Sequence, residues 1–165
     1  MMKVGFGGSC HWCTEAIFQS LRGVTQVEQG WISSEEYPSY SEAVVVHFDD
    51  EIISLESLIE IHLHTHSCTS AHAMREKYRS AVYAYDDAQN EEANLSLLTF
   101  QSQFDRPIIT QVLYFQDFRI NQETYLDYYY KNPEKAFCKN QIDPKLRKLI
   151  SRFRDKVNAD KLKLK

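Results

Sequence analysis

The chain has 165 residues, of which 43% are hydrophobic and 25% charged, and this length suits one domain with a substantial core. Nineteen Lys and Arg residues against 23 Asp and Glu residues give a net charge of −4, which favours neither nucleic acid nor a membrane surface as a partner. The first residues lack a signal peptide's apolar core and no run approaches the length of a membrane span, so we expect a cytoplasmic protein. In that reducing compartment, four cysteines indicate redox or metal chemistry more than a disulfide framework.

Hydrophobic periodicity and breaker residues predict alternating strands and helices. The expected strands are 2–7, 24–32, 43–48, 78–85 and 108–115, and the expected helices are 11–22, one capped by Ser54, and 86–104. Residues 33–40 and 66–77 are expected to be loops. The order of these elements favours an α+β fold, and we predict a ferredoxin-like two-layer sandwich with a mixed β-sheet and helices against it.

Residues 142–165 are predicted to form a C-terminal helical extension of a single domain that spans residues 1–165. Asp143 and Pro144 suit an N-cap and a first helical position, and apolar residues recur on one helical face from Leu146 to Val157. The other face is basic. We expect a solvated helix there, and the alternative is a patch for nucleic acid or an acidic partner.

Cys10 stands where a short apolar strand meets an amphipathic helix. Gly7 and Gly8, before it, permit a tight turn, and the apolar spacing after it predicts a helix that stops at Gly23. Unpaired N–H groups at a helix N-terminus stabilise a thiolate. Cys10 is therefore the candidate nucleophile, and the alternative is an inert cysteine of the core.

Residues 7–15, Gly-Gly-Ser-Cys-His-Trp-Cys-Thr-Glu, resemble the active-site signature of the peptide methionine sulfoxide reductase A family. That signature reads Gly-Cys-Phe-Trp with a glutamate three residues on. Cys10, Trp12 and Glu15 match it, whereas His11 replaces the phenylalanine. The resemblance extends to about residue 146, implies the same sandwich architecture, and implies that Trp12 and His11 hold the S-methyl group of the substrate.

Glu42 opens a β-branched strand, and strand alternation puts it on one face with Val44, Val46 and Phe48. A carboxyl group at the edge of an apolar face is desolvated, so we expect it to keep its proton near neutral pH and to act as an acid. The alternative is a strand-end glutamate that points into solvent. The resemblance supports the acid, because the family's proton-donating glutamate lies in the similar context His-Ala-Glu-Ala-Val.

Two tyrosines follow from the same resemblance. Tyr78 opens Tyr-Arg-Ser-Ala-Val-Tyr, which matches the family's Gln-Tyr-Arg-Ser-Ala-Ile, whose tyrosine hydrogen-bonds the sulfoxide oxygen. Tyr40 resembles a second such tyrosine in Pro-Thr-Tyr, but a Cys-Ser-Gly insert is absent, so Tyr37 or neither residue is the alternative. Ala73 stands where the family has a supporting aspartate, which predicts reduced or retuned activity.

A second thiol is needed to convert a sulfenic acid on Cys10 into a disulfide. Phe137-Cys138, after Asn132-Pro133, resembles the family's Tyr-Cys pair, so Cys138 is the expected resolving thiol. Cys13 is an alternative, because Cys-x-x-Cys at a helix start is a redox arrangement. Cys68 is a third candidate, for which the role of a bystander is an equal alternative.

The resemblance implies a peptide-methionine (S)-S-oxide reductase, an oxidoreductase of protein repair after oxidative stress. The thiolate of Cys10 attacks the sulfoxide sulfur, Glu42 protonates its oxygen, and Tyr78 with Tyr40 polarises the bond. The substrate is methionine sulfoxide, free or in oxidised proteins. Thioredoxin is the expected external reductant, and neither a metal nor an organic cofactor is required.

Two alternatives belong to other classes of protein. A zinc-binding module would combine Cys10 and Cys13 with further ligands, although no second pair has ligand spacing. The possible further ligands are Cys68, Cys138, His62, His64, His66 and His72. The other alternative is a catalytically impaired relative that binds a partner through the basic tail.

Overall fold

Five strands close into a mixed β-barrel in the computed structural model, which describes residues 2–162. The strand order is β1–β3–β2–β5–β4, and β4 returns to pair with β1. β4 and β5 are parallel, and the other four pairs are antiparallel. The elements are β1 (Met2–Gly7), α1 (His11–Gln19), β2 (Val24–Ser34), β3 (Ser41–Phe48), α2 (Leu55–His64), β4 (Ala81–Ala84), α3 (Asp87–Phe100), β5 (Gln111–Ile120), α4 (Tyr128–Lys131) and α5 (Asp143–Phe153).

The predicted ferredoxin-like two-layer sandwich is wrong, because the sheet has no free edges between β4 and β1. Gly5, Phe6 and Gly7 pair with Tyr83, Val82 and Ala81, which joins the two ends of what would otherwise be an open sheet. Closure gives the strands an inner and an outer face, and each face contributes to an apolar cluster. The prediction of a mixed sheet with helices against it is confirmed, whereas the open arrangement is not.

Strand alternation divides the core into two parts. Ala43, Val45 and Tyr83 belong to a small cluster inside the barrel, and their neighbours Val44 and Val46 belong to the main core outside it. α1 packs against β2 and β3 on that outer side, and α2 contacts both α3 and α5. Glu42 precedes Val44 by two residues, so it lies on the outer, helix-covered face.

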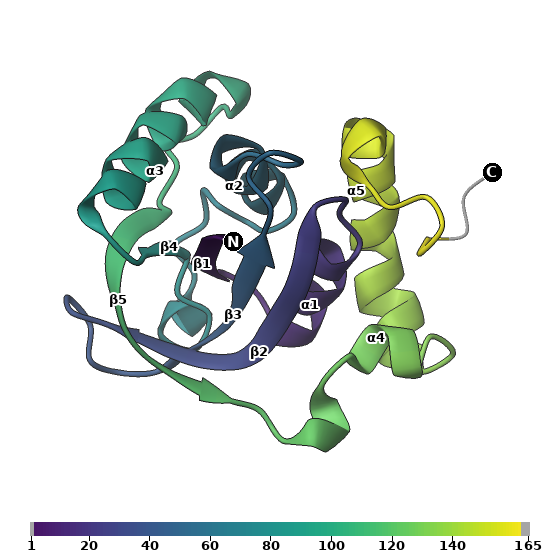
Figure 1. Ribbon diagram of the computed structural model, residues 1–165. Coiled ribbons are helices and arrows are strands. Elements are labelled where there is room, and N and C mark those ends of the chain that lie inside the picture. The colour runs from purple at the N-terminus through teal and green to yellow at the C-terminus, as the bar shows by residue number, and fades with distance from the viewer. Residues whose placement is uncertain (1, 163–165) are drawn as a thin grey trace.

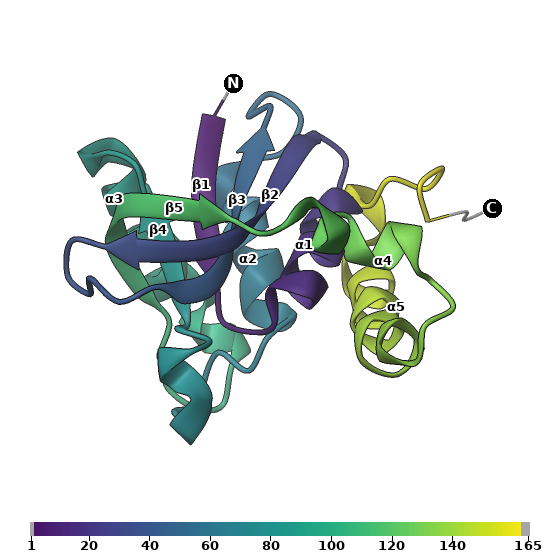
Figure 2. The same cartoon turned by 90° about the horizontal axis from the view of Figure 1, so that it is seen from below.

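The C-terminal segment lies against α1. Figures 1 and 2 show α4 and α5 on the side of the molecule that carries α1, with α3 at the opposite side. Leu146, Leu149 and Phe153 of α5 are buried in the main core. Asp143 is not the N-cap that the sequence predicted, because a π-helix, Cys138–Ile142, runs directly into α5. Its carboxylate instead accepts a hydrogen bond of 2.5 Å from the Tyr129 hydroxyl.

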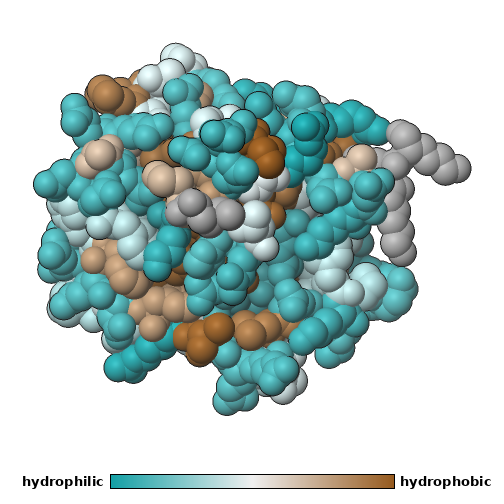
Figure 3. All heavy atoms as spheres, in the orientation of Figure 1, coloured by the Kyte–Doolittle hydropathy of each residue, from teal (hydrophilic) through white to brown (hydrophobic). Residues whose placement is uncertain are grey.

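The outer surface is mainly polar on the face drawn in Figure 3, with several apolar areas, the widest of which lies at the lower left and bottom. The predicted capping residue Ser54 is confirmed, since its hydroxyl accepts the backbone N–H of Ser57 at 3.0 Å.

Among residues 2–162, no helix has both the length and the apolar character needed to cross a membrane.

Candidate active site

Cys10 is the N-cap residue of α1 and follows a tight turn out of β1. Its carbonyl oxygen accepts the backbone N–H groups of Cys13 at 3.0 Å and Thr14 at 3.2 Å. Gly8 makes the turn with φ +152°, and a Cβ there would lie 2.4 Å from the His66 ring. The turn therefore requires glycine, and it leaves the Cys10 thiol half-buried at the start of the helix.

The pKa of Cys10 is lowered chiefly because the Cys13 thiol donates a hydrogen bond to its sulfur. Burial acts in the opposite direction, and the backbone N–H groups of Trp12 and Cys13 add to the lowering. The same hydrogen bond raises the pKa of Cys13. Of the two thiols, Cys10 is thus the one that loses its proton more readily.

Glu42 lies beside the first residue of α1 and is only 7% exposed. Its Oε1 atom accepts the backbone N–H of His11 at 3.2 Å and lies 3.4 Å from Nε2 of the same residue. The ammonium of Lys77 lies 3.6 Å from Oε2. The carboxyl group is therefore held between α1 and the segment that leads into β4.

A cavity of about 270 Å³ brings the thiol and the acid together. Its lining consists of Cys10, His11, Trp12, Glu42, Lys77, Tyr78 and Phe137. A second cavity of about 290 Å³ shares Cys10, Tyr78 and Phe137 with the first and also reaches Cys13. The Cys10 sulfur and the Glu42 carboxyl group therefore line the same depression.

Aromatic side chains of the C-terminal segment complete the apolar wall. The Trp12 ring stacks on Tyr128 with a centroid distance of 4.0 Å and meets the edge of Phe137 at 5.3 Å. Tyr125 stacks more distantly, at 5.8 Å. Tyr128 was not among the predicted site residues. The run of three tyrosines shortly before Cys138 is the feature of the sequence that points to it.

Glu15 fixes the backbone that carries part of this aromatic wall. Its two carboxylate oxygens accept the backbone N–H groups of Asp127 at 3.0 Å and Tyr128 at 3.1 Å. These N–H groups begin α4, so the glutamate of the signature fixes the helix that carries the stacking partner of Trp12. Glu15 therefore acts through positioning and does not line the cavity of Cys10.

His11 is buried and points toward β2. Its Nδ1 atom lies 2.8 Å from the carbonyl oxygen of Gly30, and its ring meets the edge of Trp31 at 5.1 Å. Burial lowers the pKa of His11, which favours the neutral imidazole. A polar ring thus forms part of the cavity wall where the family has a phenyl ring.

Tyr78 lines both cavities, whereas Tyr40 lines neither. The Tyr40 hydroxyl donates to Asp117, and its ring lies under the Arg119 guanidinium at 4.1 Å. The alternative, Tyr37, accepts a hydrogen bond from Gln111 at 3.3 Å and is also outside both cavities. Of the predicted tyrosines, the structure brings only Tyr78 to the thiol.

Lys77 joins Tyr78 to Glu42 and was missed by sequence reasoning, although it directly precedes the predicted tyrosine. A hydrogen bond with Tyr78 is the main cause that raises the pKa of Lys77, and Glu42 adds to it. The lysine thereby places a positive charge at the edge of the cavity.

Arg75 organises the loop in which the supporting aspartate is replaced by the exposed Ala73. Its guanidinium donates to the carbonyl oxygens of Gly8 at 2.7 Å and Tyr78 at 2.9 Å, and it also reaches those of Ser67 and Ser70. One half-buried cation thus holds the turn before Cys10 and the backbone of Tyr78 together.

The two remaining thiols, Cys138 and Cys68, are both buried but belong to different segments. Cys138 is fully buried at the start of the π-helix, close enough to Cys13 for an electrostatic effect on its pKa. Cys68 is buried in another loop, and burial raises its pKa to about 11. All four cysteines are free thiols.

No three His, Cys, Asp or Glu side chains converge as metal ligands within residues 2–162. The ligand set that the zinc-binding alternative needs is therefore not assembled in this part of the chain. His62 and His66 instead bind protein groups, the carbonyl of Gly7 at 2.9 Å and the hydroxyl of Ser80 at 2.7 Å.

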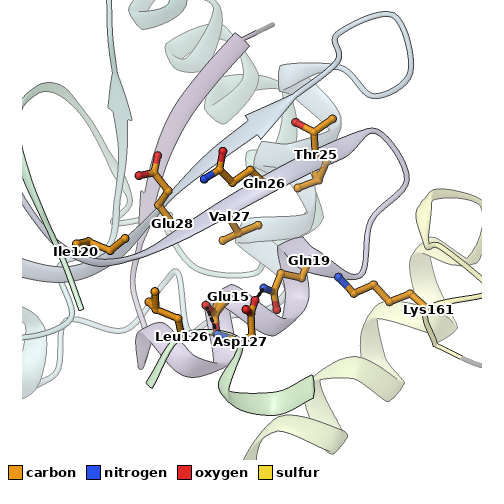
Figure 4. A pocket seen from close by; sticks show the side chains of 11 residues that line it. Glu15, Gln19, Thr25, Gln26, Val27, Glu28, Ile120, Leu126, Asp127 and Lys161 are labelled. Atoms are coloured by element: carbon orange, nitrogen blue, oxygen red, sulfur yellow. Dashed lines mark hydrogen bonds between the residues drawn. The ribbon is translucent and has the colours of Figure 1, made fainter. Parts of the chain in front are cut away.

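A larger cavity, about 350 Å³, lies elsewhere, beside α1 and β2. Figure 4 shows Glu15 and Gln19 at one side of it, both directed at Asp127. No cysteine lines this cavity. The thiol site is consequently the smaller, aromatic depression.

A thiolate at a helix start, opposite a buried carboxyl group and within an aromatic cavity, defines a thiol-dependent enzyme built on a closed mixed barrel. The family model described as "Peptide methionine sulfoxide reductase" matches residues 2–157. A relative named "Peptide methionine sulfoxide reductase MsrA", from Trichodesmium erythraeum (strain IMS101), is 35% identical over 93% of this chain and 96% of its own length. This chain belongs to the peptide methionine sulfoxide reductase family.

Solved structures share the barrel. Mxr1 from Saccharomyces cerevisiae in reduced form has a TM-score of 0.75 at 19% identity, covering 83% of this chain and 88% of that chain. Mxr1 in complex with Trx2 has a TM-score of 0.62 at 18% identity, covering 74% and 81%. At these identities the likeness establishes the fold.

Proposed function

We propose that this chain reduces methionine S-sulfoxide, free or in oxidised proteins, to methionine, and that Cys10 is its nucleophile. The observation that carries the proposal is the cavity that brings Cys10, at the N-terminus of α1, together with Glu42 and Tyr78; the lowered pKa of Cys10 agrees with it. The reaction is inferred from the family to which the chain belongs. The selectivity for the S sulfoxide is inferred from the family as well.

The chemical step transfers one oxygen atom. The thiolate of Cys10 attacks the sulfoxide sulfur while Glu42 gives a proton to the sulfoxide oxygen. The attack forms a bond between the Cys10 sulfur and the substrate sulfur. As the protonated oxygen moves to Cys10, this bond and the S–O bond of the substrate break, so Cys10 becomes a sulfenic acid oxidised by two electrons and the substrate sulfur is reduced by two. Tyr78 donates to the developing oxyanion, and Trp12 packs on the S-methyl group.

A second thiol then displaces water from the sulfenic acid and forms a disulfide. We propose Cys138 for this step on the basis of the Phe137-Cys138 resemblance, with Cys13 as the alternative. The hydrogen bond between Cys13 and Cys10 supports the alternative, whereas Cys138 is completely buried at the start of the π-helix.

Thioredoxin is the proposed reductant of the disulfide, since one of the solved structures that share this fold is that of Mxr1 in complex with Trx2. No metal or organic cofactor enters any step of the proposal. The four free thiols fit the reducing cytoplasm as the location.

The test is methionine formation from free and peptide-bound methionine sulfoxide with thioredoxin present. We expect Cys10→Ser to abolish turnover and Glu42→Gln to lower kcat by roughly 100-fold or more. The matched controls are Cys68→Ala, a thiol outside the cavity, and Glu28→Gln, a carboxylate on β2 that pairs with His47; both should keep the wild-type rate. Equal slow rates for the wild type, Cys10→Ser and Glu42→Gln would refute the enzyme and favour a catalytically impaired relative.

A further inference from the structure

We propose that the thiol site binds methionine sulfoxide within acidic stretches of oxidised proteins, and that Lys145 and Lys148 of α5 recognise the neighbouring carboxylates. This inference rests on the proposed function, because it names the class of polypeptide on which that reaction acts. It also gives a role to the basic face of the C-terminal helix, which the chemistry at Cys10 does not use.

Three adjoining cavities form a groove that begins at the thiol. The two cavities beside Cys10 share Tyr78. A third cavity, of about 180 Å³, shares Ser67 and Lys145 with the second and also reaches Lys148. We call the three together the thiol groove. A substrate that extends beyond the methionine side chain can lie along it.

The charges along the thiol groove are mainly positive. Among its lining residues within 2–162, Glu42 is the one acidic residue. The basic residues of the lining other than histidines are Lys77, Lys145 and Lys148. Lys77 lies 3.6 Å from Glu42, so these two charges offset each other. Because the whole chain has a net charge of −4, the positive charge of the groove is a local feature.

Lys145 and Lys148 have no counter-ion. Neither forms an ion pair in the part of the chain that the structure describes. Lys145 is half-buried and close enough to Cys13 for an electrostatic effect on its pKa. A partly desolvated ammonium is stabilised when an anion lies beside it. The two lysines, which share one face of α5, therefore offer a site for carboxylates next to the thiol.

The fold holds this basic face beside the nucleophile. α1, whose first turn follows Cys10, contacts α5, and Figure 2 shows the two helices side by side. Leu146 and Leu149 of α5 are buried in the main core and fix the rotation of the helix. Lys145 and Lys148, which directly precede them, consequently line the same cavity.

The groove favours a polypeptide over a single amino acid as the source of the carboxylates. Cys10 does not line the third cavity, so the group that meets Lys148 belongs to a residue other than the oxidised methionine. In an extended chain, the side chains of nearby residues reach along the groove. Their carboxylates do not touch the reacting atoms, so their effect falls on KM more than on kcat.

The experiment compares kcat/KM for peptides in which methionine sulfoxide is flanked by glutamates, serines or lysines. Dithiothreitol is the reductant, so the docking of thioredoxin does not enter the measurement. We expect a roughly three- to tenfold higher kcat/KM for the glutamate peptide than for the serine peptide, the effect of two exposed ion pairs, mainly through a lower KM. The lysine peptide should be the poorest substrate. At about 1 M salt the differences should disappear, because exposed charges are then screened.

Charge substitutions on α5 identify the residues responsible. Lys148→Glu should remove most of the difference between the glutamate and lysine peptides. Its combination with Lys145→Gln should make the lysine peptide the better substrate. The matched control is Arg147→Glu, which makes the same change in net charge at an exposed residue of α5 that lines none of the three cavities. It should keep the wild-type order of the peptides.

Three outcomes would contradict the account in different ways. Equal kcat/KM for all peptides, or an equal effect of Arg147→Glu and Lys148→Glu, would overturn the inference alone. An effect of Lys148→Glu that appears only when thioredoxin replaces dithiothreitol would also overturn it and assign the basic face to the reductant. Absence of any turnover that depends on Cys10 would instead overturn the proposed function, and this inference with it.

A readout independent of activity is the fluorescence anisotropy of labelled peptides mixed with Cys10→Ser, which binds without turnover. We expect tighter binding of the glutamate peptide than of the lysine peptide, and a loss of this difference when Lys148→Glu is added. Equal affinities for the two peptides in Cys10→Ser would contradict the inference.

Discussion

The sulfur of Cys10 receives hydrogen bonds from one side chain and two backbone groups, and the side chain contributes most. The helix start alone would supply only the N–H groups of Trp12 and Cys13, which the sequence could predict from Gly8 and the helical spacing. The thiol of Cys13 becomes a donor because it stands three residues later in the first turn of α1. Reactivity at this residue thus depends on a cysteine that the signature does not include.

Replacement of Cys13 by alanine tests this dependence. The loss of a hydrogen bond to a charged group, about 1.5–3 kcal/mol, should raise the pKa of Cys10 by roughly one to two units. The measurement is the alkylation rate of the Cys10 peptide against pH, with Cys68→Ala as the control that leaves the profile unchanged. An unaltered profile in Cys13→Ala would assign the thiolate to the backbone donors alone.

Individual residues also show where sequence reasoning reaches its limit. Cys10, Glu42 and Tyr78 could be predicted because each is specified by its own segment, a turn, a strand face and a matching motif. The position of Tyr40 outside the cavity could not be predicted, because its hydroxyl donates to Asp117 on β5, a partner 77 residues away. Lys77 was missed for the same reason, since its partner Glu42 belongs to another element.

At the level of elements, the turn between β1 and α1 determines where the thiol points.

The predicted strand 108–115 is observed as Gln111–Ile120, because pairing with β2 continues as far as Gly30 and Ile120. The predicted helix 86–104 ends at Phe100. Strand and helix existence could be read from periodicity, whereas the ends depend on which partner each element meets.

Replacement of Gly8 by alanine tests the importance of the turn. Its φ of +152° is rarely adopted by other residues, and a Cβ would meet the His66 ring at 2.4 Å. We expect a loss of roughly 1–3 kcal/mol of unfolding free energy, measured by urea unfolding, together with slower alkylation of Cys10. Wild-type stability and wild-type Cys10 reactivity in this variant would contradict the proposed dependence on the turn.

For the whole molecule, the decisive feature is barrel closure, which the sequence could not reveal. Alternating strands of this length can form an open sheet or a closed one, and the pairing of β1 with β4 is a contact between distant segments. The apolar residues of both faces were visible, but their division between an inner and an outer core was not. We propose that residues 1–165 form a single domain, as the shared core of α1 and α5 supports.

Buried imidazoles give the whole fold a pH dependence. Burial lowers the pKa of His62 well below its ordinary value and that of His66 to about 3. Below about pH 6.5 the unfolded chain binds protons at these histidines and the folded chain does not, so stability falls as the pH decreases toward 3. Each such group costs up to about 2 kcal/mol by pH 5.

The measurement is the unfolding free energy of the wild type and His62→Gln at pH 7 and pH 5. Glutamine retains a donor for the Gly7 carbonyl but does not titrate, so the variant should lose less stability than the wild type over this interval. Exposed His72→Gln serves as the control and should keep the wild-type slope. Equal losses in all three proteins would show that carboxylates alone cause the acid sensitivity.

The most direct test of the central claim is mass spectrometry after one turnover of a protein that lacks both Cys13 and Cys138. Without a resolving thiol, the sulfenic acid has no partner and should persist long enough to be trapped. We predict one added oxygen atom, or its trapped adduct, on the peptide that contains Cys10, in an amount equal to the methionine released. Methionine release with Cys10 unmodified, or oxygen on Cys68 instead, would contradict the account.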